Sequence, residues 1–363
     1  MKENMKRFKK IIFISLLGIM VYGFYAFNKP DEQYFEISKN LDIFGTLFRE
    51  VNMYYVDETK PGDLIKKGID NMLESLDPYT NYIPESDIED YRFMTTGQYG
   101  GVGATIRKSN DYVVVAEPYE GFPAYKSDLR AGDKIVEIDG KSAKGKNTDE
   151  VSKLLKGQPN TPVTLLIERE GEKKMLEKKI IREEIKINSV PYYGMLNNKI
   201  GYINLGGFTE NASKEVKDAF NELKTKNNME GLVFDLRGNP GGLLNEAVNI
   251  VNLFVDKGQE VVSTKGKVKE WEKSYKALNT PLDMNIPIVV LVNSGSASAS
   301  EIVSGAIQDL DRGVVVGQRT FGKGLVQTTR NLSYNAKLKV TTAKYYIPSG
   351  RCIQALDYSN RCL

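Results

Sequence analysis

Four serines occupy every second position of the stretch VNSGSASASE, residues 292–301, namely Ser294, Ser296, Ser298 and Ser300. A serine hydroxyl is a weak nucleophile unless a neighbouring base accepts its proton, and histidine is the usual base. The chain contains no histidine. Ser-His-Asp catalysis and the common histidine-containing zinc sites are therefore excluded, and any serine nucleophile must use another base.

The serines lie where an apolar run, IPIVVLV, gives way to SASEIVSGAIQDL, a pattern that predicts a strand followed by a helix. The N-terminus of a helix favours negative charge, which suits an alkoxide or an oxyanion. The simpler interpretation is that serine caps the helix, and that alternating Ser and Ala allow the helix to pack close to a sheet. The spacing does not show which serine would react.

A candidate base, Lys323, lies in VGQRTFGKGLVQTTRNL, residues 316–332. A lysine can accept a serine proton only when neutral, so burial must lower its pKa from about 10.4 to about 7 or 8. Its flanks carry no acidic residue. If the chain is extended here, Gln327 shares a face with Lys323 and can bond its amine without restoring the charge. The alternative is a solvated lysine on a glycine turn.

The same stretch contains part of a phosphate-binding motif. Gly317, Gly322 and Lys323 fit G-x-x-x-x-G-K, but Gly324 stands where a Ser or Thr is needed to hold magnesium. A phosphate loop must also open a helix, whereas LVQTTRNL is typical of a strand. Nucleotide binding is therefore disfavoured.

A third stretch, GLVFDLRGNPGGLLNEAVNI at residues 231–250, predicts a buried strand, a glycine-rich turn and a helix. Glycines allow backbone amides to approach a substrate oxygen closely, as an oxyanion hole requires. A plain strand-to-helix turn is the alternative interpretation.

These stretches belong to the last of three patterns along the chain. Residues 31–88 predict helices, with Pro61 suited to a helix start. Short β-rich runs with one small helix then predict a compact module over residues 89–185. From residue 186 to 363, apolar strands alternate with helices, which implies parallel βαβ units with ligands beyond the carboxyl ends of the strands.

The first thirty residues have a different character. Five basic residues lie among the first ten and are followed by residues 11–27, which carry no charge. A signal peptide and a membrane anchor both have this form. We favour an uncleaved anchor, because Val21 and Gly23 make a weak cleavage site, and a buried core helix is the third alternative. The rest of the chain is then expected outside the cytoplasm, in the cell envelope or periplasm.

The remaining composition limits the partners. Residues 11–363 carry 45 basic and 46 acidic side chains, with no concentrated basic run, so nucleic acid is a poor candidate partner. Cys352 and Cys362 either close a small loop in an oxidising compartment or remain free thiols. Their spacing does not form a metal-ligand cluster.

The order of several motifs resembles that of the C-terminal processing peptidases, which are serine endoproteases with an inserted PDZ domain. The resemblance runs from about residue 35 to the end and is carried by LDPYTNYIP, YGGVGATI, LRAGDKIVEIDGK, GYINLGGFT, DLRGNPGG, GSASASEI, TFGKGLVQ and TTAKYYIPSGR. It implies an α+β multidomain fold, with a crotonase-like ββα protease core, a PDZ domain and an N-terminal helical region. It also implies catalysis without a cofactor or a metal.

The resemblance assigns the catalytic residues. The serine three residues before the Glu of SASE, here Ser298, is the nucleophile, and the lysine of the FGKG turn, Lys323, is its base. Gln327 orients the lysine. The oxyanion amides are expected from Gly241 or Gly242 and from Ala299, and the substrate is a protein or peptide with a free C-terminus.

The resemblance also implies a PDZ peptide site, in which loop amides hold the substrate carboxylate and the peptide adds as a strand. The expected loop residues are Tyr99, Gly100, Gly101, Val102 and Gly103. Apolar pocket residues are expected in the helix TDEVSKLLKG, at Val151 and at Leu154 or Leu155. A further hypothesis is that Arg130 reports peptide occupancy to the active site.

Two departures from the family pattern and two open alternatives remain. Tyr79 stands where the family often has His, and family members usually continue past the PSGR segment, so the end of the core is expected to be missing. The helical region is expected to pack or to form a homodimer. The rival to the enzyme is a PDZ-containing binding or scaffold protein with a degenerate protease core.

Overall fold

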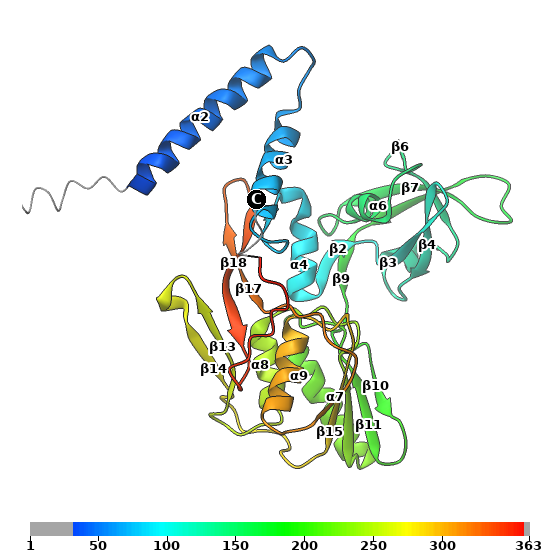
Figure 1. Ribbon diagram of the computed structural model, residues 1–363. Coiled ribbons are helices and arrows are strands. Elements are labelled where there is room, and N and C mark those ends of the chain that lie inside the picture. Colours follow the sequence, from blue (N-terminus) through cyan, green and yellow to red (C-terminus); the bar gives the residue numbers. More distant parts are fainter. Residues whose placement is uncertain (1–31, 359–363) are drawn as a thin grey trace, which may run out of the picture. The chain divides into compact units, whose positions relative to one another are not determined.

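The computed structural model of the protein describes residues 32–358, and the chain divides into two units after residue 69 (Figure 1). The expected membrane segment, residues 11–27, lies outside the described residues. Among the helices that are described, none combines the length and the apolar character needed to cross a membrane.

The first unit is helical, as the sequence predicts. Helix α2 (Glu32–Tyr54) is followed by α3 (Pro61–Glu74), which extends into the second unit. Pro61 is the first residue of α3, where proline lacks an N–H that the helix would leave unpaired anyway. Many apolar side chains of α2 are exposed, among them Phe35, Leu41, Phe44 and Leu47. The expected homodimer stays a prediction.

The second unit begins with short elements that lead into a small β-module. These are β1 (Asn81–Ile83), the 3-10 helix η1 (Glu85–Asp87) and α4 (Ile88–Thr96). Strand β2 (Gln98–Gly101) leads into the module and β9 (Glu183–Lys186) leads out of it. The two pair antiparallel, with Gly100 opposite Glu184, so the entry and exit of the module are held together.

The module has a six-stranded sheet in which β3-β4-β5-β7-β8 is the strand order and β6 pairs with β5. Its elements are β3 (Ala104–Ser109), β4 (Tyr112–Pro118), α5 (Pro123–Lys126), β5 (Lys134–Ile138), β6 (Lys141–Ser142), α6 (Thr148–Leu155), β7 (Pro162–Glu168) and β8 (Leu176–Ile181). Buried side chains alternate with exposed ones along β7, which is the period that one covered sheet face requires. Asn147 caps α6 in a reciprocal exchange with Glu150.

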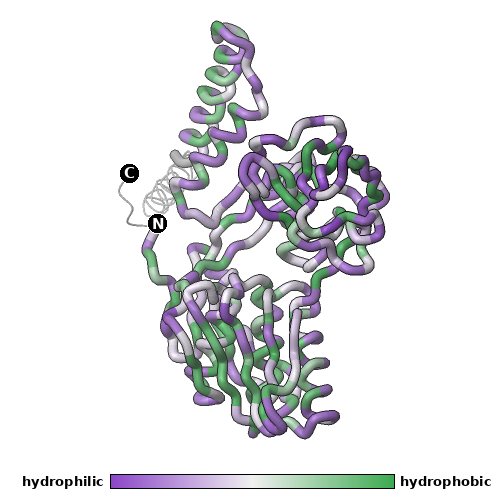
Figure 2. Tube along the Cα trace, turned by 90° about the vertical axis from the view of Figure 1, so that its right-hand side faces the viewer, coloured by the Kyte–Doolittle hydropathy of each residue, from purple (hydrophilic) through white to green (hydrophobic). Residues whose placement is uncertain are grey.

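The remainder is built around a mostly parallel sheet with the order β10-β11-β12-β15-β16. Its elements are β10 (Tyr192–Met195), β11 (Ile200–Asn204), α7 (Ala212–Asn227), β12 (Gly231–Asp235), α8 (Leu244–Asn252), β15 (Ile288–Val292), α9 (Ala299–Asp309) and β16 (Val314–Gly317). Only β10 runs antiparallel to its neighbour. In Figure 2 hydrophobic stretches run through this region between hydrophilic loops. The predicted alternation of strands and helices is confirmed.

A second, antiparallel sheet completes the core, and the sequence patterns did not indicate it as a unit. Its order is β1-β18-β13-β14, with β17 paired to β18. The elements are β13 (Glu260–Gly266), η2 (Lys269–Trp271), β14 (Lys273–Lys276), β17 (Leu325–Asn331) and β18 (Lys337–Tyr346). Because β17, not a helix, follows Lys323, the structure removes the phosphate-loop alternative.

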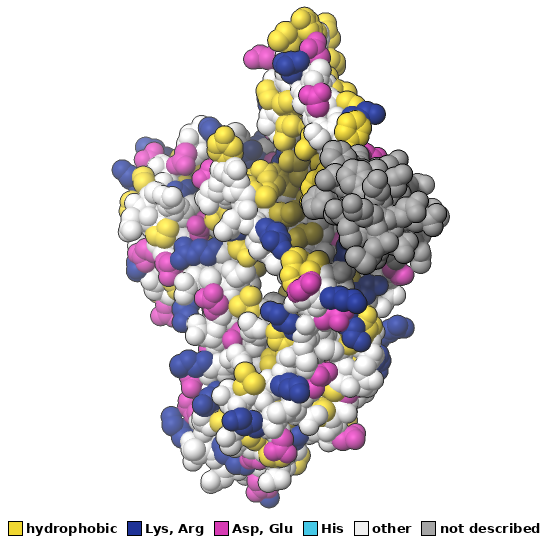
Figure 3. Space-filling view, turned by 90° about the vertical axis from the view of Figure 1, so that its left-hand side faces the viewer, with side chains coloured by type: hydrophobic (Ala, Val, Ile, Leu, Met, Phe, Trp, Pro, Cys, Tyr) yellow, Lys and Arg dark blue, Asp and Glu magenta, His cyan; other side chains and the backbone are white. Residues whose placement is uncertain are grey.

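Charged side chains of both signs are interspersed over the face of the molecule shown in Figure 3. That face therefore lacks the concentrated basic patch that a phosphate backbone requires. Cys352 is partly buried, whereas Cys362 lies outside the described residues.

Two isoleucines of the module provide a matched test of its packing. Ile167 on β7 is 0% exposed, whereas Ile181 at the end of β8 is 48% exposed. Ile167→Ala should lower the free energy of opening of the module by about 2–5 kcal/mol, because it removes buried methyl groups and leaves a cavity. Ile181→Ala should change it by less than about 0.5 kcal/mol. Hydrogen exchange of the β5 and β7 amides in the full chain measures both, and equal effects would contradict the assigned packing.

Candidate active site

The four serines have different surroundings, and these distinguish them. Ser296 is buried and donates to the Leu236 carbonyl oxygen at 2.7 Å. Ser300 is buried and donates to the Asn239 carbonyl oxygen at 2.9 Å. Ser294 is exposed. Ser298 lines a cavity of about 610 Å³. Of the four, Ser298 is the one placed to meet a substrate.

Ser298 occupies a strained turn between β15 and α9. Its φ is +56° and its ψ is −113°, a conformation that is costly for a residue with a Cβ. The strain places Ser298 directly before the first turn of α9, where the positive end of the helix dipole lies. The turn needs a close neighbour without a side chain. A Cβ at Gly241 would lie 2.8 Å from the Cβ of Ser298.

The Glu301 carboxylate connects the serine turn to the lysine turn. It is 3% exposed and accepts hydrogen bonds from the backbone amides of Ser298 at 2.8 Å, Gly322 at 2.6 Å and Lys323 at 2.8 Å. The sequence analysis did not assign Glu301 a role. The signal was present, since Ser-x-x-Glu at a helix start is a capping pattern.

Lys323 lines the same cavity as Ser298, and its amine lies 4.4 Å from the ring centre of Tyr79. The pKa of Lys323 is lowered to about 8, chiefly by burial and also by the charge of Lys339, while Asp77 and Glu301 act in the opposite direction. The sequence-based expectation of a depressed pKa agrees with this environment.

The hydroxyl of Tyr345 lies between the two turns. It donates to the carbonyl oxygen of Lys323 and lies near enough to the side chain of Ser298 for that side chain to affect the pKa of Tyr345. Burial raises the pKa of Tyr345, so its proton is retained. Among the described residues, no hydrogen bond joins the side chains of Ser298 and Lys323 directly. In this arrangement the Tyr345 hydroxyl lies beside the side chain of Ser298.

The expected hydrogen bond between Gln327 and Lys323 is not formed. The Gln327 amide donates instead to the Leu325 carbonyl oxygen and to Thr341 Oγ1, each at 3.3 Å. The same-face argument assumed a regular strand from Lys323 onward. Strand β17 begins only at Leu325, and its pairing with β18 shifts register between Val326 and Gln327. Gln327 nevertheless lines the cavity.

The amides expected at the oxyanion site differ in availability. The Gly241 amide donates to Asn239 Oδ1 at 2.9 Å and is therefore occupied. In the described part of the chain, the amides of Gly242 and Ala299 donate no hydrogen bond. The ideal Cβ position at Gly241 lies 2.9 Å from the Ala299 nitrogen, so this glycine leaves the Ala299 amide open. Gly242 and Ala299 are the better candidates.

Apolar side chains form much of the cavity wall around this polar group. They come from α4, from the loop after β11, from the start of α8, from α9 and from β17, and include Phe93, Phe208, Leu244, Ile302 and Leu325. A wall of this kind excludes water and accepts an apolar peptide side chain. Within residues 32–358 no group of three or more His, Cys, Asp or Glu side chains could hold a metal ion.

The glycine-rich loop of the module is only partly available for a carboxylate. The Gly100 amide already donates to the Glu89 carboxylate of α4 at 2.9 Å. The amides of Val102 and Gly103 donate to no acceptor among the described residues. Tyr99 and Gly101 belong to β2, which pairs with β9. The open part of the loop is therefore Val102 and Gly103.

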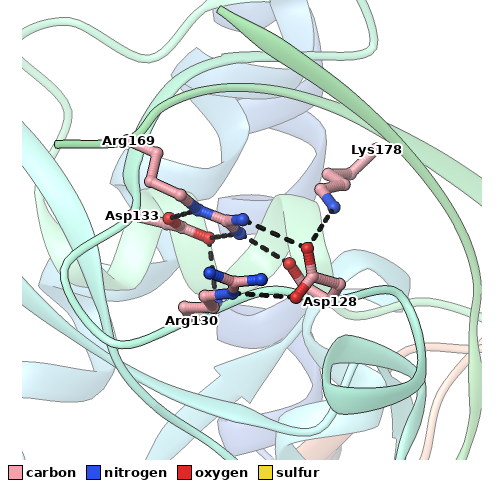
Figure 4. A network of polar contacts seen from close by, with 5 residues as sticks. All are labelled: Asp128, Arg130, Asp133, Arg169 and Lys178. Carbon is pink, nitrogen blue, oxygen red and sulfur yellow. Dashed lines mark hydrogen bonds and ion pairs between the residues drawn. The ribbon is translucent and has the colours of Figure 1, made fainter. Parts of the chain in front are cut away.

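The other residues expected at the peptide site lie in two places. Val151 and Leu155 are buried in the core of the module, whereas Leu154 is partly exposed. Arg130 pairs with Asp128 at 2.8 Å, in a network that also contains Asp133, Arg169 and Lys178 (Figure 4). These contacts of Arg130 stay inside the module, and its reporting role stays a prediction.

Comparison with known proteins decides the family. The peptidase family S41 model matches residues 199–358, and a PDZ domain model matches residues 114–169. A carboxy-terminal-processing protease of Bartonella bacilliformis is 40% identical over 321 residues, covering 88% of this chain and 73% of the relative. The chain belongs to peptidase family S41.

Two further likenesses agree with this S41 assignment. A probable CtpA-like serine protease of Staphylococcus aureus is 39% identical over 352 residues, covering 94% of this chain and 68% of the relative. The structure of the photosystem II D1 C-terminal processing protease matches with a TM-score of 0.50 and 33% identity, covering 86% of this chain and 89% of that one. The S41 chain is thus a serine-type peptidase with a PDZ domain, and its mixed α/β fold is confirmed.

Glu301 offers a test of how this S41 site is assembled. Glu301→Ala leaves buried amides of the two turns without an acceptor, at a cost of about 1–3 kcal/mol for each unpaired donor. We expect a lower melting temperature and a kcat reduced on the order of 10²-fold, because the serine and lysine turns are no longer held together. The exposed Glu270→Ala is the control. Unchanged kcat in Glu301→Ala would show that the carboxylate does not align the site.

Proposed function

We propose that the protein is an endopeptidase that cleaves peptide bonds through an acyl-enzyme, with Ser298 as nucleophile and Lys323 as base. The observation that carries the proposal is that Lys323 and Ser298 line one cavity, with the pKa of Lys323 lowered to about 8. A lysine with that pKa is partly neutral near pH 7.5 and can accept the serine proton.

The reaction follows from these groups. Ser298 Oγ attacks the substrate carbonyl carbon while Lys323 Nζ accepts its proton, and the same ammonium then protonates the leaving amine. The amides of Gly242 and Ala299 bond the oxyanion. Water, deprotonated by Lys323, hydrolyses the acyl-enzyme and restores the serine. For the first step, the lysine amine must take the place that the Tyr345 hydroxyl holds beside Ser298.

The dyad is tested by two substitutions and a pH profile. Ser298→Ala and Lys323→Met should each lower kcat/KM by about 10⁴-fold or more on a disordered protein substrate read by mass spectrometry. Wild-type kcat should rise with pH through about 8, because the base is active only when deprotonated. Lys344→Met, which changes an exposed lysine of β18, is the control. Retained activity in Lys323→Met would assign the base elsewhere.

We further propose that the PDZ domain selects substrates by their C-terminal carboxylate. The support is the pair of unoccupied amides at Val102 and Gly103, followed by the edge strand β3, which pairs only with β4. A peptide that adds to that edge would place its terminal carboxylate at the two amides. The Glu89 carboxylate at Gly100 limits the loop to this part.

Carboxylate recognition predicts a difference between two forms of one substrate. A substrate with an amidated C-terminus should have a KM about tenfold or more above that of the free acid, since hydrogen bonds to a charged group contribute about 1.5–3 kcal/mol. The cleavage site is identical in both forms. If both forms give the same cleavage products, a difference in KM reflects binding of the C-terminus. Equal KM values for the acid and the amide would contradict tail recognition and leave the dyad untouched.

A further inference from the structure

A second lysine, Lys339, lines the catalytic cavity, and the reaction above leaves it without a role. It lies on β18 where that strand is flanked on both sides, opposite Asn81 of β1 and Thr329 of β17. The cavity wall therefore receives Lys323 from the turn before β17 and Lys339 from β18. Both lysines line this one cavity, although the pairing of β17 with β18 places Lys339 opposite Thr329 and Lys344 opposite Leu325.

Lys339 differs from the other lysines of its strand because it has no partner. Lys337 donates to Asn331 Oδ1 at 2.7 Å, and Lys344 lies 3.9 Å from a carboxylate oxygen of Asp357. Within residues 32–358, the amine of Lys339 makes no hydrogen bond, ion pair or ring contact. Burial lowers its pKa for lack of solvation. An unpaired amine in such a place is unfavourable for folding, which points to a functional reason for its presence.

The charged groups around Lys323 change its pKa in opposite directions. Asp77, which precedes β1, and Glu301 of α9 favour the ammonium form of Lys323, whereas the positive charge of Lys339 disfavours it. Both carboxylates already accept backbone hydrogen bonds, Asp77 from Tyr79 and Thr80 and Glu301 from the two catalytic turns.

The tyrosines beside the base add no charge. Burial raises the pKa of Tyr79 to about 12 and raises that of Tyr345 well above its usual range, so both rings stay neutral at physiological pH. Among the described residues, Lys339 is thus the cation that offsets the two carboxylates. The repulsion between two ammonium groups is stronger in a cavity than in water, because the surroundings screen it less.

We infer that Lys339 is a positioning residue that acts through Lys323, its charge keeping the amine of the base in the neutral form that accepts the serine proton. This inference rests on the proposed function, in which Lys323 is the base. Lys339 itself transfers no proton and forms no bond to the substrate.

The test measures nucleophile activation without a peptide substrate. The rate at which a fluorophosphonate probe labels Ser298 is followed from pH 6 to pH 10 in the full chain. In Lys339→Met the acid limb of the profile should move to higher pH by on the order of one unit, because loss of the neighbouring charge raises the pKa of Lys323. Labelling near pH 7 should then fall up to about tenfold, while labelling near pH 10 should be unchanged.

Two variants separate charge from packing. Lys339→Arg keeps the positive charge and should keep the wild-type profile, whereas Lys339→Gln removes it and should follow Lys339→Met. Lys344→Met on the same strand is the control and should match wild type. Melting temperatures of all variants identify any that are unfolded, and the comparison uses the neutral variant that retains its fold.

The possible outcomes distinguish the inference from the proposed function. If Lys323→Met labels as fast as wild type, the dyad itself is wrong. If Lys323→Met is silent but the folded Lys339→Met or Lys339→Gln gives the wild-type profile, only the role of Lys339 is overturned. An unshifted profile with a raised KM for acidic substrates alone would also overturn it, by making Lys339 a binding residue for a substrate carboxylate.

Discussion

The active site depends on one buried carboxylate. Glu301 accepts hydrogen bonds from the backbone amides of Ser298, Gly322 and Lys323. A single side chain therefore sets the position of the strained serine turn and of the turn that carries the lysine. Ser298 and Lys323 are twenty-five residues apart in the sequence; the serine turn follows β15 of the parallel sheet, and the lysine turn leads from that sheet into β17 of the antiparallel one. A buried carboxylate is stable only when its oxygens are paired, and here the two turns supply the donors. The two turns are therefore held together through the one carboxylate to which the amides of both donate hydrogen bonds.

The proposed mechanism requires a neutral lysine, and the surroundings of Lys323 fit that requirement. Its amine lies among apolar side chains and over the ring of Tyr79, without an ion pair to a carboxylate among the described residues. Asp77 and Glu301 are close enough to influence the pKa, yet both direct their oxygens to backbone amides. The carboxylate of Glu301 that holds the backbone of Lys323 thus also favours its charged form, and the charge of Lys339 acts against this effect.

The PDZ domain contacts helix α4, which precedes it in the chain and also lines the cavity of the protease core. Its entry and exit strands β2 and β9 pair with each other, and α4 before them contributes Glu89 to the Gly100 amide and Phe93 to the catalytic cavity. Lys156, which follows α6 in the PDZ domain, forms an ion pair with Asp90 of α4. Helix α4 therefore contacts both the glycine-rich loop of the PDZ domain and the cavity that Ser298 lines.

Much of this could be deduced from the order of residues alone. The absence of histidine makes lysine the candidate base, and the acid-free flanks of Lys323 allow its amine to be neutral. Local periodicity predicts most strands and helices, because it depends only on neighbouring residues. Spacing alone did not distinguish the four serines. The family resemblance pointed to Ser298, and the tertiary contacts of Ser296 and Ser300 with carbonyls about sixty residues away set it apart physically. The predicted hydrogen bond between Gln327 and Lys323 was wrong, because a register shift in β17 breaks the alternation of side chains that the prediction assumed. Tyr345 and Lys339 reach the cavity through pairing of β18 with other strands, and no local pattern encodes which strands pair.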